Sequence, residues 1–252
     1  MYDERAKHEK EYFDREYGKA EELSLDVNPF MFAKYKTPAD FADWRQRSAA
    51  LLGDVKGLTL LDYGCGIGQE TTYFALLGAE VCATEVSETA IALAKQRAAH
   101  NGVGASVRFF VVDGIRLEFD DNHFDRIHGL GVLHHVGLGA LAEIKRVLKP
   151  GGRAVFLEHM GSSKFLVPMI RKLFRVREEY SPDEKPLDFS DVREAGKSFS
   201  ACEIYPFHLS YRLRRFLPTW IHNSLLRLDA ATLRWIPPLE RYAGGAVILF
   251  VK

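Results

Sequence analysis

The feature that most constrains this fold is a regular alternation of short apolar runs and helical segments over residues 58–159. Apolar runs predict strands at Leu58–Tyr63, Glu80–Thr84, Ser106–Val112, Asp125–Gly131 and Arg153–Glu158. Helical patterns between these runs predict βαβ units, which build a parallel sheet covered by helices on both faces. With later runs at Cys202–Phe207 and Ala246–Lys252, we expect a doubly wound, mostly parallel, seven-stranded α/β sheet.

The remaining segments predict additions to a single domain that spans residues 1–252. Residues 1–55 predict an N-terminal helical cap, with helices over Tyr2–Tyr17 and after Thr37–Pro38. Residues 56–160 form the expected core. Residues 161–190 and 209–243 are helical insertions, placed after the fifth strand and between the sixth and seventh strands.

Composition excludes several classes of protein. Lys plus Arg and Asp plus Glu both number 34 in 252 residues, which disfavours a general nucleic-acid binder. The three cysteines are widely spaced, so neither a disulfide framework nor a metal site is expected. The first residues are densely charged and no apolar stretch is long enough to span a membrane, so we expect a soluble, cytoplasmic protein.

A glycine-rich turn between the first strand and the first helix of the core predicts a ligand site. Residues 62–68 read Asp-Tyr-Gly-Cys-Gly-Ile-Gly. Such a turn lets a ligand approach the backbone closely, at the carboxyl edge of the sheet where doubly wound folds bind ligands. A dinucleotide turn has the spacing G-x-G-x-x-G, but here Gln69 occupies the position of the third glycine. No P-loop lysine follows either.

Leu61–Gly68 resembles the first motif of the class I S-adenosylmethionine-dependent methyltransferases. Further segments continue the resemblance in the right order: Glu85, Asp113–Gly114, Leu130–Gly131 and the Lys149–Gly152 turn. The resemblance covers residues 58–159 and implies a Rossmann-like sheet and S-adenosyl-L-methionine as the cofactor.

The resemblance also implies how the cofactor is held. Glu85 would accept hydrogen bonds from the ribose diol, Asp113 and the Gly114 N–H would bind adenine, and Leu130 and Gly131 would hold the methionyl amine through their carbonyls. Cys65 is expected to be a small neighbour within the turn, not a nucleophile. The full set of predicted cofactor-binding residues is Asp62, Gly64, Cys65, Gly66, Gly68, Gln69, Glu85, Val86, Asp113, Gly114, Leu130, Gly131 and His135.

Two residues are predicted to act in catalysis, His134 and Glu158. His134 follows the fourth strand and would be a base or an acceptor-orienting group, although both histidines of this pair can equally be packing residues. Adjacent side chains point apart, so His135 is expected to be structural or to flank the cofactor. Glu158 ends the fifth strand and can orient an acceptor, position the base or form a structural ion pair. His128, inside the fourth strand, is expected to be buried and hydrogen-bonded.

The acceptor is predicted to be small and hydrophobic. Oxygen is the preferred acceptor atom and nitrogen is second; the alternative is carbon methylation of a quinone-like or lipid acceptor at a membrane surface. The cap would cover the site, with Tyr12, Tyr17, Tyr35 and Trp44 as candidate lining residues.

The basic, apolar insertions can pack on the sheet, form a homodimer or lie in a membrane interface. The rival interpretations of the whole chain are a nicotinamide-dependent oxidoreductase and a non-catalytic binding protein.

Overall fold

The computed structural model describes residues 2–18, 24–27, 44–112, 115–161, 186–207, 209, 225, 228–229, 231–233 and 235–252. The predicted site residues Asp113 and Gly114 lie outside these described residues. So do Tyr35, the first residues of the helix expected after Thr37–Pro38 and most of both insertions; the described part of that helix is α3 (Trp44–Leu52).

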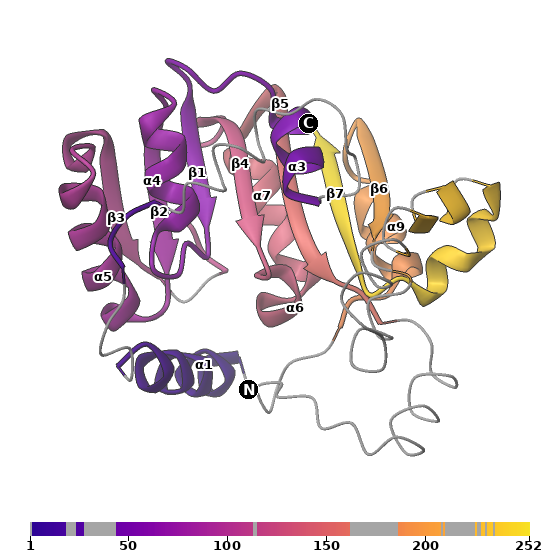
Figure 1. The fold of residues 1–252 in the computed structure, drawn as a ribbon, viewed down its shortest axis with the longest axis horizontal. Helices are drawn as coiled ribbons and strands as arrows, with labels where there is room; N and C mark the ends of the chain where they lie inside the picture. The colour runs from indigo at the N-terminus through magenta and orange to yellow at the C-terminus, as the bar shows by residue number, and fades with distance from the viewer. Residues whose placement is uncertain are drawn as a thin grey trace.

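A single seven-stranded sheet organises the chain, in the order β3-β2-β1-β4-β5-β7-β6 (Figure 1). The strands are β1 Thr59–Tyr63, β2 Glu80–Glu85, β3 Val107–Val111, β4 Phe124–Leu130, β5 Leu148–His159, β6 Ala201–Phe207 and β7 Gly245–Val251. The first five strands pair in parallel, and β7 runs antiparallel to both β5 and β6. The predicted fold class is confirmed.

Helices cover both faces of the sheet because successive strand residues point to opposite sides. Leu61 and Phe156 belong to the apolar cluster that includes α6 (Leu133–Val136), α7 (Leu141–Val147) and α9 (Phe189–Gly196). Leu60 and Val155 belong to the cluster on the other face, with α3 (Trp44–Leu52), α4 (Gln69–Leu76) and α5 (Glu88–His100). No helix in the described segments is long and apolar enough to cross a membrane.

One sequence-based boundary is wrong. The Lys149–Gly152 segment is not a turn that precedes the fifth strand, because β5 already begins at Leu148 and pairs there with Phe124. The pairing register then shifts, so these residues form an irregularity inside the strand pair. The Lys149 ammonium fixes this segment through Asp125, with Nζ 2.8 Å from Oδ2.

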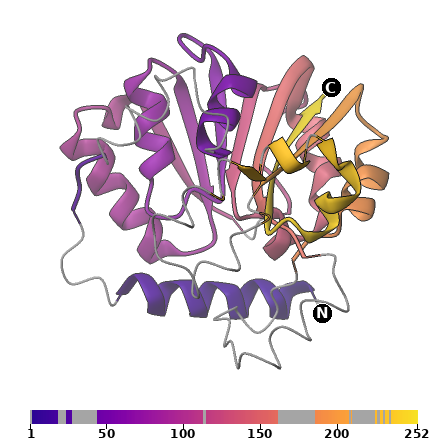
Figure 2. The same cartoon turned by 45° about the vertical axis from the view of Figure 1, so that its right-hand side comes forward.

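Helix α1 (Tyr2–Gly18) lies across the carboxyl edge of the parallel strands, as Figures 1 and 2 both show. Asp14 fastens it to the start of α5: its Oδ1 accepts hydrogen bonds from the Ser87 hydroxyl (2.5 Å) and the Thr89 N–H (3.2 Å). Burial raises the pKa of Asp14, but hydrogen bonds from Ser87, Lys10 and Thr89 outweigh it and lower that pKa to about 2. Ser87 also caps α5, as predicted, by accepting the Ala90 N–H at 3.0 Å.

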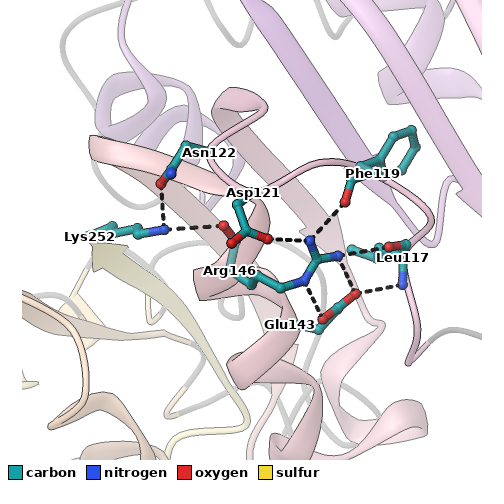
Figure 3. A network of polar contacts seen from close by, with 7 residues as sticks. All are labelled: Leu117, Phe119, Asp121, Asn122, Glu143, Arg146 and Lys252. Atoms are coloured by element: carbon teal, nitrogen blue, oxygen red, sulfur yellow. Dashed lines mark hydrogen bonds and ion pairs between the residues drawn. The ribbon is translucent and has the colours of Figure 1, made fainter.

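The loop between β3 and β4 is anchored to α7 by Arg146 (Figure 3). Its guanidinium donates to the carbonyl oxygens of Leu117 (2.9 Å) and Phe119 (2.8 Å), and to the carboxylates of Asp121 and Glu143. Those two carboxylates raise the pKa of Arg146. Several charge-assisted hydrogen bonds thus hold the loop that follows the predicted adenine-binding segment.

Candidate active site

A cavity of about 590 Å³ lies between α1 and the carboxyl ends of β1, β2, β4 and β5. Eleven residues that the sequence predicts as site residues line it: Asp62, Gly64, Cys65, Gly66, Gln69, Glu85, Val86, Leu130, Gly131, His134 and His135. Val112, the residue that precedes the predicted adenine ligand Asp113, also lines the cavity. Gly68 and Glu158 are not among the lining residues.

The glycine turn has the backbone geometry that only glycine adopts readily. Gly64 has φ +71°, and a Cβ there would lie 2.7 Å from the Val132 side chain. Gly66 has φ +50° and lies beneath the Tyr17 hydroxyl of α1, which would be 3.1 Å from an added Cβ. Gly68, with φ +77°, instead allows α4 and α5 to pack closely, because a Cβ added there would lie 2.7 Å from the Cβ of Ala94. The turn therefore brings its first two glycines, and not the third, to the cavity.

The Asp62 carboxylate fixes the start of this turn through two side-chain contacts. One carboxylate oxygen lies 3.1 Å from Nδ1 of His128, and the other accepts the Thr71 hydroxyl of α4 at 2.5 Å. His128 is buried and hydrogen-bonded, which confirms its predicted structural role.

Cys65 is buried as well, and this burial raises the pKa of its thiol, so the side chain is not a thiolate nucleophile.

Glu85 ends β2 with its carboxylate held by three backbone N–H groups. Oε2 accepts from Gly66 at 2.9 Å, and Oε1 accepts from Val86 at 2.8 Å and from Ser87 at 3.1 Å. A carboxylate has about four lone-pair positions, so acceptor capacity remains for a ligand hydroxyl. Burial raises the pKa of Glu85, although the three N–H groups counteract that effect.

The structure brings the two predicted catalytic residues into contact. Nδ1 of His134 lies 2.7 Å from Oε2 of Glu158. The N–H groups of Val132 (3.0 Å) and Leu133 (2.8 Å) donate to the other oxygen of this fully buried carboxylate. An ionised Glu158 would only accept hydrogen bonds, so Nδ1 of His134 would carry a proton and Nε2 the basic lone pair. Because Glu158 does not line the cavity, this geometry matches positioning of a base and not direct contact with an acceptor.

His135 lines the same cavity as His134, contrary to the expectation that adjacent side chains would point apart. The two rings lie with centroids 4.2 Å apart, because the chain forms only one short helical turn, α6, at the cavity wall. His135 reaches α1, where its Nδ1 lies 3.1 Å from Oε2 of Glu9 and its ring meets Phe13 edge-on at 5.4 Å.

One face of α1 closes the cavity through Glu9, Phe13 and Tyr17. Tyr17 and Trp44 line the cavity as predicted, whereas Tyr12 does not. The sequence prediction selected only tyrosines and a tryptophan and therefore missed Glu9 and Phe13. The four-residue spacing of the three lining residues, which places them on one helix face, is the signal that identifies them.

Two further charged side chains and one histidine line the cavity without having been assigned to it: Arg45 of α3, Glu70 of α4 and His159 of β5. Nε of Arg45 lies 3.8 Å from Oε1 of Glu70, and burial raises the pKa of Glu70. The His159 ring lies edge-on to His134, with centroids 5.5 Å apart. Across the described segments, no group of three or more His, Cys, Asp or Glu side chains is arranged to hold a metal ion.

Residues 61–156 match the family model described as a methyltransferase domain. The ubiquinone/menaquinone biosynthesis C-methyltransferase UbiE of Azotobacter vinelandii is 34% identical over 129 residues, which cover 49% of this chain and 51% of that protein. The demethylmenaquinone methyltransferase of Staphylococcus aureus is 30% identical over 192 residues, 69% of this chain and 77% of that protein. This chain thus spans about half the length of some curated relatives and three quarters of another.

Among solved structures, the geranyl diphosphate C-methyltransferase of Streptomyces coelicolor superposes with a TM-score of 0.61 at 18% identity, over 98% of this chain and 96% of that chain. It was crystallised with S-adenosyl-L-homocysteine, and its likeness supports the fold. Fold, cavity and comparisons agree on a class of enzymes that use S-adenosylmethionine. The chain belongs to the class I S-adenosylmethionine-dependent methyltransferase family.

Proposed function

We propose that this protein transfers the methyl group of S-adenosylmethionine to a ring carbon of a small, hydroxylated, quinol-like acceptor. The single structural observation that carries the proposal is the His134–Glu158 pair at the wall of the cavity. The preference for carbon rests on relatives named as C-methyltransferases and demethylmenaquinone methyltransferases. It replaces the oxygen acceptor that the sequence alone favoured.

The residues of the cavity fit this cofactor. Gly64 and Gly66 line the cavity with bare backbone, which a nucleoside can approach closely. Glu85 would accept from the ribose, and Leu130 and Gly131 would present backbone carbonyls to the methionyl amine. When bound, the cofactor supplies an electrophilic methyl group on a sulfonium centre.

His134 would remove the hydroxyl proton of the acceptor through Nε2. Glu158 keeps the imidazole in the required tautomer and stabilises the positive charge that it gains. Loss of the hydroxyl proton would increase electron density on the neighbouring ring carbon, which would form the bond to the methyl carbon as the bond from that carbon to sulfur breaks and S-adenosylhomocysteine leaves. That carbon afterwards releases its hydrogen as a proton and the oxygen regains one, so the net product is a methylated ring and one proton. Helix α1 would exclude water from this reaction.

The test is to incubate the protein with isotopically labelled S-adenosylmethionine and naphthoquinols with or without a short prenyl tail. Product NMR distinguishes a methyl group on a ring carbon from a methyl ether. A ring-methylated product supports the proposal. A methyl ether would overturn the carbon assignment and restore the oxygen alternative. If the protein binds S-adenosylhomocysteine but methylates none of these acceptors, the acceptor class is wrong.

A lipid-like acceptor would bring the protein to a membrane surface. Leu228, Trp235 and Ile236 are exposed apolar side chains, and the Trp235 side chain is 81% exposed. They belong to a segment, 209–241, with six arginines and two acidic residues. Apolar side chains combined with positive charge favour anionic lipid. Co-sedimentation with vesicles of anionic and of neutral lipid tests this contact, and dimerisation without vesicle binding would favour the homodimer instead.

A further inference from the structure

Apart from its histidines, the charged side chains that line the cavity are carboxylates with one exception. Its acidic lining residues are Glu9, Asp62, Glu70 and Glu85. Arg45 is the only lysine or arginine among the described residues that line it. The proposed cofactor is zwitterionic at its methionyl end, and a carboxylate that enters such a cavity needs a cation to offset repulsion from the surrounding acids.

Arg45 lies on the side of the glycine turn where the methionyl end would point. Its Nε is 3.8 Å from Oε1 of Glu70, in the first turn of α4 directly after the glycine turn. The preceding residue, Trp44, lies with its ring centroid 6.4 Å from that of His159 at the end of β5. Glu85, the proposed ribose ligand, ends β2, and the strand order places β1 and β4 between β2 and β5. A ligand anchored at Glu85 that extends along this edge therefore reaches Arg45.

We infer that Arg45 binds the methionyl carboxylate of the cofactor, a role that rests on the proposed function. Nothing in the sequence motifs assigned this carboxylate. A guanidinium has several N–H donors in a planar fork, so one arginine can contact Glu70 and a ligand carboxylate at the same time. The Arg45–Glu70 ion pair, at 3.8 Å, is longer than a hydrogen bond, so a ligand carboxylate at hydrogen-bond distance would be a closer acceptor than Glu70.

The experiment compares two ligands by calorimetry: S-adenosylhomocysteine and its decarboxylated analogue, which keeps the nucleoside, the sulfur and the amine. Arg45→Gln should weaken S-adenosylhomocysteine binding about 10- to 100-fold, as expected for loss of a charged hydrogen-bonded contact. Its affinity for the decarboxylated analogue should stay unchanged or rise. Arg45→Lys, which keeps the charge without the fork, should fall between the two.

Arg47→Gln is the matched control, because Arg47 lies in the same helix, outside the cavity lining, with its guanidinium 4.5 Å from the ring centroid of Tyr205. It should leave both affinities unchanged. Equal losses for both ligands in Arg45→Gln would show a structural role and overturn the inference. Unchanged S-adenosylhomocysteine binding in Arg45→Gln would overturn it too. If the unsubstituted protein binds neither ligand, the proposed function fails before the inference is reached.

Discussion

Glu158 and His134 meet across the carboxyl ends of two adjacent strands, with Oε2 of the glutamate 2.7 Å from Nδ1 of the histidine. The register of the sheet creates the contact, since Leu130 of β4 lies opposite Leu157 of β5 and the chain turns into α6 directly afterwards. The carboxylate is completely buried while the imidazole lines the cavity. A buried acid that orients a cavity-facing imidazole is an arrangement suited to a general base.

His134→Ala should lower turnover roughly 100-fold while S-adenosylhomocysteine affinity is retained, because the proposed role of the imidazole is to act on the acceptor. Steady-state kinetics and calorimetry on the same preparation measure the two effects. Equal losses of cofactor affinity and turnover would mean that His134 shapes the cofactor site. Unchanged turnover would leave alignment and exclusion of water as the sources of catalysis.

Glu158→Gln should lower turnover about 10- to 100-fold, as expected for loss of one charged hydrogen bond. A carboxylate favours the protonated imidazole, so its removal makes His134 less basic. The acid limb of the pH–rate profile should therefore move to lower pH. A lower rate with an unmoved profile would assign Glu158 a purely structural role.

The elements that the sequence predicted well are those with local signals. The glycine turn, the acid at Glu85 and the Ser87 cap each occupy a few consecutive residues, and local backbone geometry explains all three. The contact between His134 and Glu158 joins residues 24 positions apart, so it depends on a strand register that no local pattern specifies. The packing role of Gly68 depends in the same way on Ala94 of another helix.

Gly68→Ala tests that packing role against a matched glycine. Gly68 and Gly102 both have positive φ, +77° and +73°, but an added Cβ meets Ala94 at Gly68 and nothing within 4 Å at Gly102. Both substitutions carry the backbone strain, and only Gly68→Ala adds a collision. Chemical denaturation should show Gly68→Ala to be about 1–3 kcal/mol less stable than Gly102→Ala. Equal free energies of unfolding for the two variants would show that α4 and α5 accommodate the added methyl group without loss of stability.

Asp14→Ala should loosen α1 from the cavity, because it removes the acceptor of the Ser87 hydroxyl and the Thr89 N–H. We expect faster proteolysis within α1 and S-adenosylhomocysteine affinity about twofold to tenfold weaker, since Asp14 is partly exposed and each bond contributes modestly. Glu11→Ala is the control, because Glu11 is exposed and pairs only distantly, at 4.0 Å, with Lys7. Identical proteolysis of the two variants would show that Asp14 does not hold the helix.

Cofactor affinity should fall at mildly acidic pH because of Glu85. Burial raises its pKa above the ordinary value of 4.5, so this carboxyl takes up a proton at a pH where an exposed glutamate is still ionised. The protonated form loses acceptor capacity for the ribose, and affinity therefore decreases as the pH falls through the raised pKa. Calorimetry with S-adenosylhomocysteine between about pH 5 and pH 8 measures the decrease.

Glu85→Gln should bind more weakly at neutral pH and show little dependence on pH in this range, because the titrating group is gone. Glu80→Gln changes an exposed glutamate at the opposite end of the same strand and should keep the pH dependence of the unsubstituted protein. If the dependence persists in Glu85→Gln, another group controls it. The buried Glu70, whose pKa is also raised by burial and which lines the same cavity, is then the next to substitute.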